Sequence, residues 1–161
     1  MNMMKLAVIA ALAVFNASGY AEEIKVKTVT ENGRLVDDIN IPFVADQAVL
    51  GKWVSVDFVR TPGAFTPGIQ SFNGDLYLEG LNFLPNGRTA QPWWTWTKGI
   101  LMHKGDRTAA RYEIRQIDGQ EYMFLEWKSG DYTIRHQTPQ YYVLKKQLTN
   151  DGAGFILPSK N

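Results

Sequence analysis

The residue types that most often carry out chemistry are sparse in this chain. It has only two histidines, His103 and His136, and no cysteine. A catalytic zinc ion needs three protein ligands, and Asp106 or Asp131 would complete such a set only if folding brought it close. The sequence therefore favours two surface histidines, and it predicts no metal site and no cofactor.

Sequence signatures of common catalytic mechanisms are also missing. The chain has no Gly-x-Ser-x-Gly turn for a nucleophilic serine, no His-Glu-x-x-His zinc helix and no glycine-rich phosphate loop. No pair of carboxylates stands out for glycoside hydrolysis, because strand sequence does not fix their separation. The sequence predicts no catalytic residues and favours a protein that is not an enzyme.

The most unusual local feature is the tryptophan cluster Trp93-Trp94-Thr95-Trp96. On a strand, Trp94 and Trp96 share one face and Trp93 points to the other. Such flat rings could form a platform for a sugar, a peptide side chain or an apolar ligand. Core filling is the favoured alternative. Because the wall of a barrel is one layer thick, we expect at least one of the three rings to stay partly exposed.

Glu126 is the one carboxylate in an unusual place, because it lies in a strand that is apolar on both faces. Pointing inward, it would need a buried partner such as Arg111, Arg115 or Arg135, and the pair would anchor a small ligand. Pointing outward, it would pair with Lys128 or another neighbour, and this orientation is favoured. Glu126 and Arg135 are kept as candidate ligand contacts.

These side chains must be positioned by β-strands, because alternating segments follow one another between short turns such as Asn32-Gly33. Even spacing and tight turns indicate an antiparallel meander. A meander this long must close on itself or pack on a second sheet, because open edges invite aggregation. The sequence predicts an all-β fold, an antiparallel up-and-down β-barrel of about eight or nine strands. The predicted strands are Glu22–Thr30, Leu35–Val44, Lys52–Arg60, Leu76–Leu84, Trp93–Met102, Thr108–Gln116, Glu121–Lys128, Asp131–His136 and Tyr141–Lys146.

The strand Lys52–Arg60 is ambiguous in its orientation. Val54, Val56 and Phe58 make the better core face. Trp53 would then need a bulge or an end position to turn inward.

The first 21 residues are typical of a secretory signal peptide. Lys5 precedes the apolar run Leu6–Phe15, and the small residues Gly19 and Ala21 mark a cleavage site. The run is too short to span a bilayer, which needs roughly 20 residues. We therefore expect a signal peptide over 1–21, one domain over 22–146 and a C-terminal tail over 147–161, in a periplasmic or secreted protein.

The charge of the expected mature chain also excludes some partners. The full chain has 17 Lys and Arg and 16 Asp and Glu, and Lys5 is the one charged residue before position 22. Without Lys5, the expected mature chain has 16 positive and 16 negative side chains and is neutral. A neutral domain has no bulk electrostatic reason to bind nucleic acid or an anionic membrane. We expect a monomer that binds no nucleic acid and whose mature chain does not insert into a membrane.

Gly51-Lys52-Trp53 resembles the Gly-x-Trp signature of lipocalins and their calycin relatives. In that family the Trp closes one end of the barrel and a late Arg lies over the indole. The resemblance implies a lipocalin-like barrel in which Arg135 is the cation–π partner of Trp53.

A longer resemblance covers about residues 35–146. It rests on Val49–Trp53, Val56–Val59, Gly74–Leu78, Trp96–Gly99, Phe124–Tyr132 and Tyr141–Lys146. In these segments the chain is similar to an extracytoplasmic domain of bacterial membrane metallopeptidases of the antirepressor or β-lactam-sensor type. The chain shows no transmembrane helix and no metallopeptidase zinc motif, so the resemblance implies sensing or binding rather than proteolysis.

The sequence thus predicts an exported, non-catalytic binding module for a small apolar, peptide or glycan ligand. The irregular stretch Thr61–Gly74 is either a lid over the pocket or a solvated connection. The alternatives are a protein-interaction or inhibitor module that uses loops and exposed aromatics, and an enzyme of unknown type. The predicted pocket lining is Trp53, Tyr77, Trp94, Trp96, Tyr112, Phe124 and Tyr142, with Glu126 and Arg135 as polar contacts.

Overall fold

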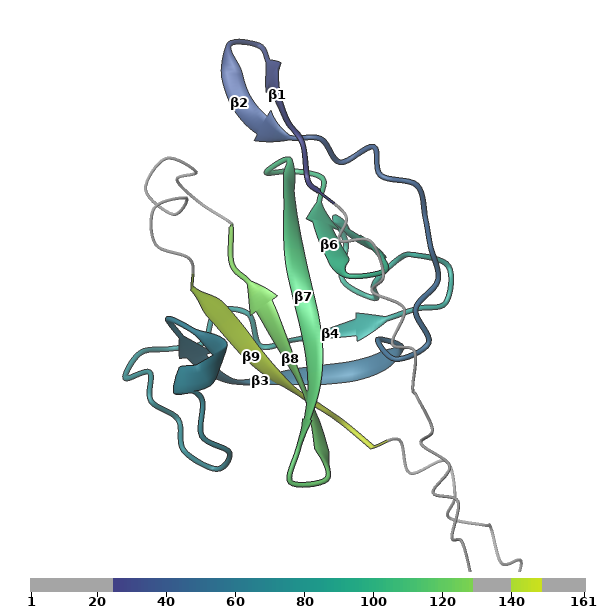
Figure 1. The fold of residues 1–161 in the computed structure, drawn as a ribbon. Coiled ribbons are helices and arrows are strands. Elements are labelled where there is room, and N and C mark those ends of the chain that lie inside the picture. Colours follow the sequence, from purple (N-terminus) through teal and green to yellow (C-terminus); the bar gives the residue numbers. More distant parts are fainter. Residues whose placement is uncertain (1–24, 129–139, 149–161) are drawn as a thin grey trace, which may run out of the picture.

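The computed structural model describes residues 25–128 and 140–148. In this part of the chain, seven strands form one antiparallel sheet in the order β4-β3-β9-β8-β7-β6-β5, which curls into a nearly closed barrel (Figure 1). A separate hairpin pairs β1 with β2. The prediction of an all-β antiparallel up-and-down barrel is confirmed. The elements are β1 Thr28–Glu31, β2 Arg34–Asp37, β3 Gly51–Val59, the short 3-10 helix η1 Pro62–Ala64, β4 Gly80–Phe83, β5 Trp94–Thr97, β6 Ile100–His103, β7 Thr108–Ile117, β8 Gln120–Glu126 and β9 Tyr141–Lys146.

Several predicted strand bounds are wrong. The segment Trp93–Met102, predicted as one strand, is the hairpin β5–β6, because Gly99 adopts a left-handed φ of +76° and turns the chain. The segments predicted over Leu76–Leu84 and Leu35–Val44 contain only the short strands β4 and β2. The turn at Asn32-Gly33 is confirmed, with both φ values positive. The strand predicted over Asp131–His136 lies outside the described residues.

The two edge strands β4 and β5 are joined by the segment between them. The Leu84 N–H donates to the Arg88 carbonyl at 2.9 Å, and the Trp96 N–H donates to the Gly87 carbonyl at 2.7 Å. Arg88 also pairs with Thr95 in an isolated bridge. These bonds satisfy backbone groups that an open sheet would leave at its edge.

A β-bulge decides which side chains of β3 point inward. The register with β9 shifts between Ser55 and Asp57. Odd-numbered residues of β3 therefore point inward before the shift, and even-numbered residues point inward after it. Trp53 is fully buried in the interior cluster, and Phe58, beyond the bulge, packs against the same cluster. The predicted core face of Val54, Val56 and Phe58 is therefore wrong as a set, whereas the inward turn of Trp53 beside a bulge is confirmed.

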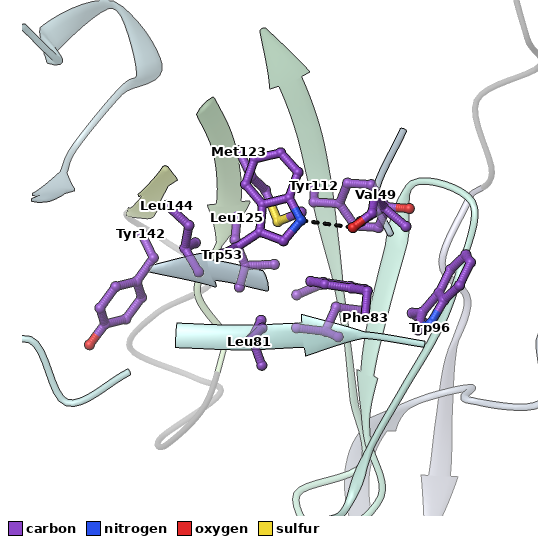
Figure 2. Packing of buried hydrophobic residues seen from close by; sticks show 12 residues of the cluster. Val49, Trp53, Leu81, Phe83, Trp96, Tyr112, Met123, Leu125, Tyr142 and Leu144 are labelled. Atoms are coloured by element: carbon purple, nitrogen blue, oxygen red, sulfur yellow. Dashed lines mark hydrogen bonds between the residues drawn. The ribbon is translucent and has the colours of Figure 1, made fainter. Parts of the chain in front are cut away.

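Large side chains fill the barrel interior toward the end where β3 begins (Figure 2). The Trp53 indole N–H donates to the Val49 carbonyl at 2.7 Å, so its polar atom is satisfied although the ring is buried. The Tyr112 hydroxyl lies 3.1 Å from Oδ2 of Asp46, and burial raises the pKa of Tyr112. The cluster consists of Val49, Trp53, Leu81, Phe83, Trp96, Leu101, Ala110, Tyr112, Met123, Leu125, Tyr142 and Leu144.

Two smaller clusters cover the outside of the barrel. Phe65, next to η1, packs on Tyr122 and Phe124, with ring centroids 4.9 and 5.9 Å apart. This contact explains why β8 is apolar on both faces. On the other side, Val26, Ile39 and Ile41 pack on Ile100, Met102 and Ala109.

The hairpin β1–β2 is attached to the barrel by a buried carboxylate. Oδ2 of Asp37 accepts a hydrogen bond from the Ala109 N–H at 2.9 Å and lies 3.6 Å from Nζ of Lys128. Glu31 forms a second ion pair with Arg107. Figure 1 shows this hairpin extending from the end of the barrel where β6 ends and β7 begins.

Candidate functional site

Five aromatic side chains form a continuous row at one end of the barrel, opposite the end that Trp53 fills. β3 and β8 end there, and β5 and β9 begin there. Apart from Tyr142, which is buried, the rings are half-buried. We name this set the aromatic row, and it consists of Phe72, Phe58, Tyr142, Trp127 and Trp94.

The rings of the aromatic row contact one another in sequence. Phe72 and Phe58 have centroids 5.4 Å apart, Phe58 and Tyr142 4.7 Å, Tyr142 and Trp127 4.8 Å, and Trp127 and Trp94 6.3 Å. All these separations lie in the range that aromatic pairs favour. The row is therefore a preformed apolar surface rather than a set of isolated rings.

Strand pairing sets the order of the row. Phe58 lies directly opposite Tyr142 in the β3–β9 register. The Trp127 N–H donates to the Gln140 carbonyl at 2.8 Å, which keeps Trp127 beside the start of β9. Because these positions follow from backbone hydrogen bonds, the rings are placed by rigid elements.

Phe72 is not on a strand, and the carboxylate of Asp57 holds it in place. This buried carboxylate accepts hydrogen bonds from the Phe72 N–H at 3.1 Å, from the Ser71 hydroxyl at 2.8 Å and from the Ser71 N–H at 3.1 Å. Burial by itself raises the pKa of Asp57, but the hydrogen bonds from Ser71, Phe58 and Phe72 together lower it below its ordinary value.

The stretch Thr61–Gly74, for which the sequence left a lid and a solvated connection open, is thus tied to the barrel at two points. Asp57 binds its C-terminal part, and Phe65 packs on the outer wall. Phe72 therefore forms a fixed wall of the site.

A hollow of about 420 Å³ opens between the end of β3 and this stretch. This volume lies in the range of small-molecule sites. Arg60 is the one charged residue among the described residues that line it. We name it the Phe72 hollow, and its lining is Phe58, Val59, Arg60, Ala64, Ser71, Phe72 and Gln140.

Of the residues predicted to contact a ligand, Trp94 and Tyr142 lie in the aromatic row. Trp53, Trp96 and Tyr112 are buried in the interior cluster, where they fill the core and close the Trp53 end. Figure 2 shows the three side chains among the other core residues, and each is at most 7% exposed, so none offers an open surface to a ligand.

Two predicted pocket residues lie elsewhere. Tyr77 is 89% exposed and lines no interior surface, although its neighbours Leu76 and Leu78 pack against the interior cluster. Phe124 faces outward beneath Phe65, since alternate residues of β8 belong to opposite clusters. The prediction that these two side chains line an interior pocket is wrong.

The two predicted polar contacts have different outcomes. Leu125 belongs to the interior cluster, so strand alternation places Glu126 on the outward side, which is the favoured orientation. Its negative charge contributes to raising the pKa of the neighbouring Tyr141, after burial as the main cause. Arg135 lies outside the described residues.

Sequence reasoning missed the residues that form the Phe72 hollow. It treated Phe58 as a core residue and did not single out Phe72 within the irregular stretch Thr61–Gly74. The alternation of polar and apolar residues in β3 contained a usable signal. A buried Asp57 in that strand demands hydrogen-bond donors, and the following loop supplies them.

A cation does lie over the Trp53 ring. Nζ of Lys146, at the end of β9, is 5.3 Å from the ring centroid. The same ammonium donates to the Ala48 carbonyl at 2.8 Å and lies 3.2 Å from Glu121. The contact of Lys146 with the ring is a cation–π interaction, whereas Arg135, for which the resemblance implied that role, lies outside the described residues.

The histidine that the structure describes is part of the protein framework. The His103 ring packs on Trp94 with centroids 4.5 Å apart, and its Nδ1 accepts a hydrogen bond from the Asp106 N–H at 3.0 Å. His136 lies outside the described residues. Within residues 25–128 and 140–148, no group of three or more metal-binding side chains is assembled.

No family model matches the chain, and no curated protein or solved structure is significantly similar to it. The resemblance to the extracytoplasmic domain of sensor-type metallopeptidases therefore stays a prediction. The part of the chain that the structure describes contains no helix with the length and apolar character needed to cross a bilayer.

Proposed function

We propose that the chain is an exported, non-catalytic binding module that takes a small apolar molecule with an acidic group in the Phe72 hollow. The observation that carries this proposal is a hollow walled by two aromatic rings in edge-to-face contact, with Arg60 as the one cation among the described residues that line it. Of the three ligand classes that the sequence left open, this lining favours the small apolar one.

The apolar part of the ligand would contact rings that are already in place. Phe58 is fixed by its strand and Phe72 by Asp57, so binding would order few side chains. A preformed site loses less conformational entropy on binding than one that must assemble. The hollow is also large enough for a ligand of moderate size.

The acidic part of the ligand would contact Arg60. This side chain is exposed, and no carboxylate of the described residues pairs with it. An unpaired guanidinium beside an apolar surface favours a carboxylate or sulfonate, because charge-assisted hydrogen bonds are the stronger kind.

Export is part of the proposal and rests on the sequence of residues 1–21. A charged start, an apolar run and the small residues Gly19 and Ala21 are the pattern of a cleaved signal peptide. N-terminal sequencing of the protein recovered from the producing cells tests it. A mature chain that begins at Glu22 is expected, and a retained Met1 would contradict export by this route.

Binding is tested with two probes that differ in charge. Anilinonaphthalenesulfonate carries a sulfonate, and Nile red is neutral. We expect both to gain fluorescence with the protein. Phe72→Ala should weaken the binding of both probes by at least tenfold, which is about 1.4 kcal/mol. Arg60→Gln should weaken the binding of the anionic probe by a similar factor and leave the binding of Nile red unchanged.

Matched controls separate the site from general surface effects. Tyr77→Ala removes an exposed aromatic residue from the segment between β3 and β4, and Arg34→Gln removes an exposed cation from β2. Neither should change the affinity of either probe. Equal losses with Tyr77→Ala and Phe72→Ala, or no binding of either probe, would contradict the proposal.

A second candidate is a protein-interaction module, and one observation favours it. Tyr77 and Ile69 are 89% and 61% exposed on the same irregular stretch, and exposed aromatic residues are typical of interfaces. If Tyr77→Ala abolishes the activity of the protein in its host while probe binding is intact, this candidate replaces the first.

A further inference from the structure

A second hollow lies where the two edge strands meet, away from Phe58 and Phe72. Its volume is about 260 Å³. Among the described residues, its lining combines two aromatic rings, two cations and hydrogen-bonding side chains, and it includes no carboxylate. We name it the Trp93 cleft, and its lining is Arg88, Thr89, Ala90, Gln91, Pro92, Trp93, Trp94, Thr95 and Lys104.

Trp93 is held in an unfavourable backbone conformation. Its φ is +73°, in the left-handed region that bulky residues rarely adopt. The Trp93 carbonyl accepts a hydrogen bond from the Lys104 N–H at 2.9 Å, which fixes the conformation. The side chain is nevertheless 65% exposed, so core packing does not account for a tryptophan here. Strain of this kind concentrates where a side chain must be presented to a ligand.

The floor of the cleft is rigid. The Gln91 amide donates to the Gly80 carbonyl at 3.3 Å and accepts from the Asn82 N–H at 3.1 Å. The Thr89 hydroxyl donates to the Gln91 carbonyl at 2.9 Å. These bonds tie the cleft to β4, so its shape exists before any ligand arrives.

The cleft is positively charged. Arg88 and Lys104 are both exposed, and neither forms an ion pair with a carboxylate in the described part of the chain. Two unpaired cations beside one hollow favour an anionic ligand over a neutral one.

We propose that the Trp93 cleft binds an acidic saccharide, a sugar ring that carries a carboxylate. The apolar face of the ring stacks on Trp93, and the carboxylate meets Arg88 and Lys104. Of the two rings, Trp93 is exposed and Trp94 is half-buried. One exposed ring among hydroxyl and amide groups suits a pyranose, which is apolar on its faces and polar around its rim. A planar aromatic anion would instead gain most from rings on both of its faces.

The test uses isothermal titration calorimetry with trigalacturonic acid and its trimethyl ester, which has the same rings without the charges. We expect the acid to bind and the ester to bind at least tenfold more weakly. Trp93→Ala should weaken binding of trigalacturonic acid by at least tenfold. Arg88→Gln and Lys104→Gln should each weaken it severalfold. Lys98→Gln, an exposed cation that does not line the cleft, should leave the affinity unchanged.

Three results would overturn the proposal: no binding of the acid, equal binding of acid and ester, or full affinity in Trp93→Ala. Circular dichroism of each variant shows whether a loss reflects misfolding. Phe72→Ala should keep full affinity for the acid, so this test is independent of the proposal for the Phe72 hollow. An affinity that falls with Phe72→Ala but not with Trp93→Ala would place the saccharide in the other hollow.

Discussion

Ser71 donates two hydrogen bonds to the buried carboxylate of Asp57, from its hydroxyl at 2.8 Å and from its backbone N–H at 3.1 Å. The pair joins the β-bulge of β3 to the irregular stretch that follows η1. Phe72, the next residue, then packs on Phe58 and forms a wall of the hollow. A local irregularity of one strand thus positions the candidate ligand site.

Asp57→Asn should destabilise the protein. The amide has the same shape, but its NH₂ group meets N–H and O–H donors in place of an acceptor. Loss of charge-assisted bonds in a buried place costs about 2–3 kcal/mol. Urea unfolding followed by tryptophan fluorescence measures this loss. Asp75→Asn, at an exposed position, is the control and should change the free energy of unfolding by less than about 0.5 kcal/mol.

Acid should loosen the same contact. Because the folded-state pKa of Asp57 is lowered from its ordinary value of 3.8, its contribution to stability is fully present above that pH. It is lost as the pH falls through the lower folded-state value. We expect the gap in stability between the native protein and Asp57→Asn to be constant from neutral pH to about pH 5 and to shrink below pH 4. A gap that is unchanged at pH 3 would assign the effect of the substitution to packing.

Lys146→Met should lower stability by about 1 kcal/mol. The substitution keeps an apolar stem but removes the ammonium over Trp53 and its bond to the Ala48 carbonyl. Thermal unfolding checks it, with Lys145→Met as the matched neighbour because Lys145 has no ion-pair partner in the described residues. Equal effects of the two substitutions would show that the cation over the indole is unimportant.

Substitutions at Trp93 should invert the usual order of glycine and alanine. Trp93→Gly and Trp93→Ala both remove the ring, but only glycine adopts the φ of +73° without strain. We expect Trp93→Gly to be more stable than Trp93→Ala by about 1 kcal/mol. Denaturant unfolding of the two variants measures the difference. An alanine variant as stable as the glycine variant would mean that the backbone relaxes once the ring is gone.

The fold was largely predictable from the sequence because its signals are local. Alternation in Thr108–Gln116 and positive-φ residues at Asn32-Gly33 identify strands and turns without knowledge of distant contacts. The hairpin β5–β6 was missed because Lys98-Gly99 interrupts an otherwise apolar run by only two residues. Periodicity over such a short segment does not distinguish one strand from two.

The candidate site was much less predictable. Trp94 and Tyr142, which were predicted to line a pocket, lie in the aromatic row, but the sequence did not indicate that Phe58 and Phe72 would join them. Their contact depends on a bulge, which reverses the facing of every later residue of β3. Phe124 was misplaced for a related reason. The sequence of a strand that is apolar on both faces does not show which face points inward until the residue that covers its outer face, here Phe65, is known.

The most direct test of the account is an amide chemical-shift titration of the isotope-labelled protein with decanoate, a small apolar molecule with an acidic group. We predict saturable shifts centred on Arg60, Ser71, Phe72 and Gln140, which line the hollow, and none at the buried Trp53. Saturable shifts centred on the Trp53 end of the barrel, or no shifts at millimolar decanoate, would contradict the assignment of the Phe72 hollow as the ligand site.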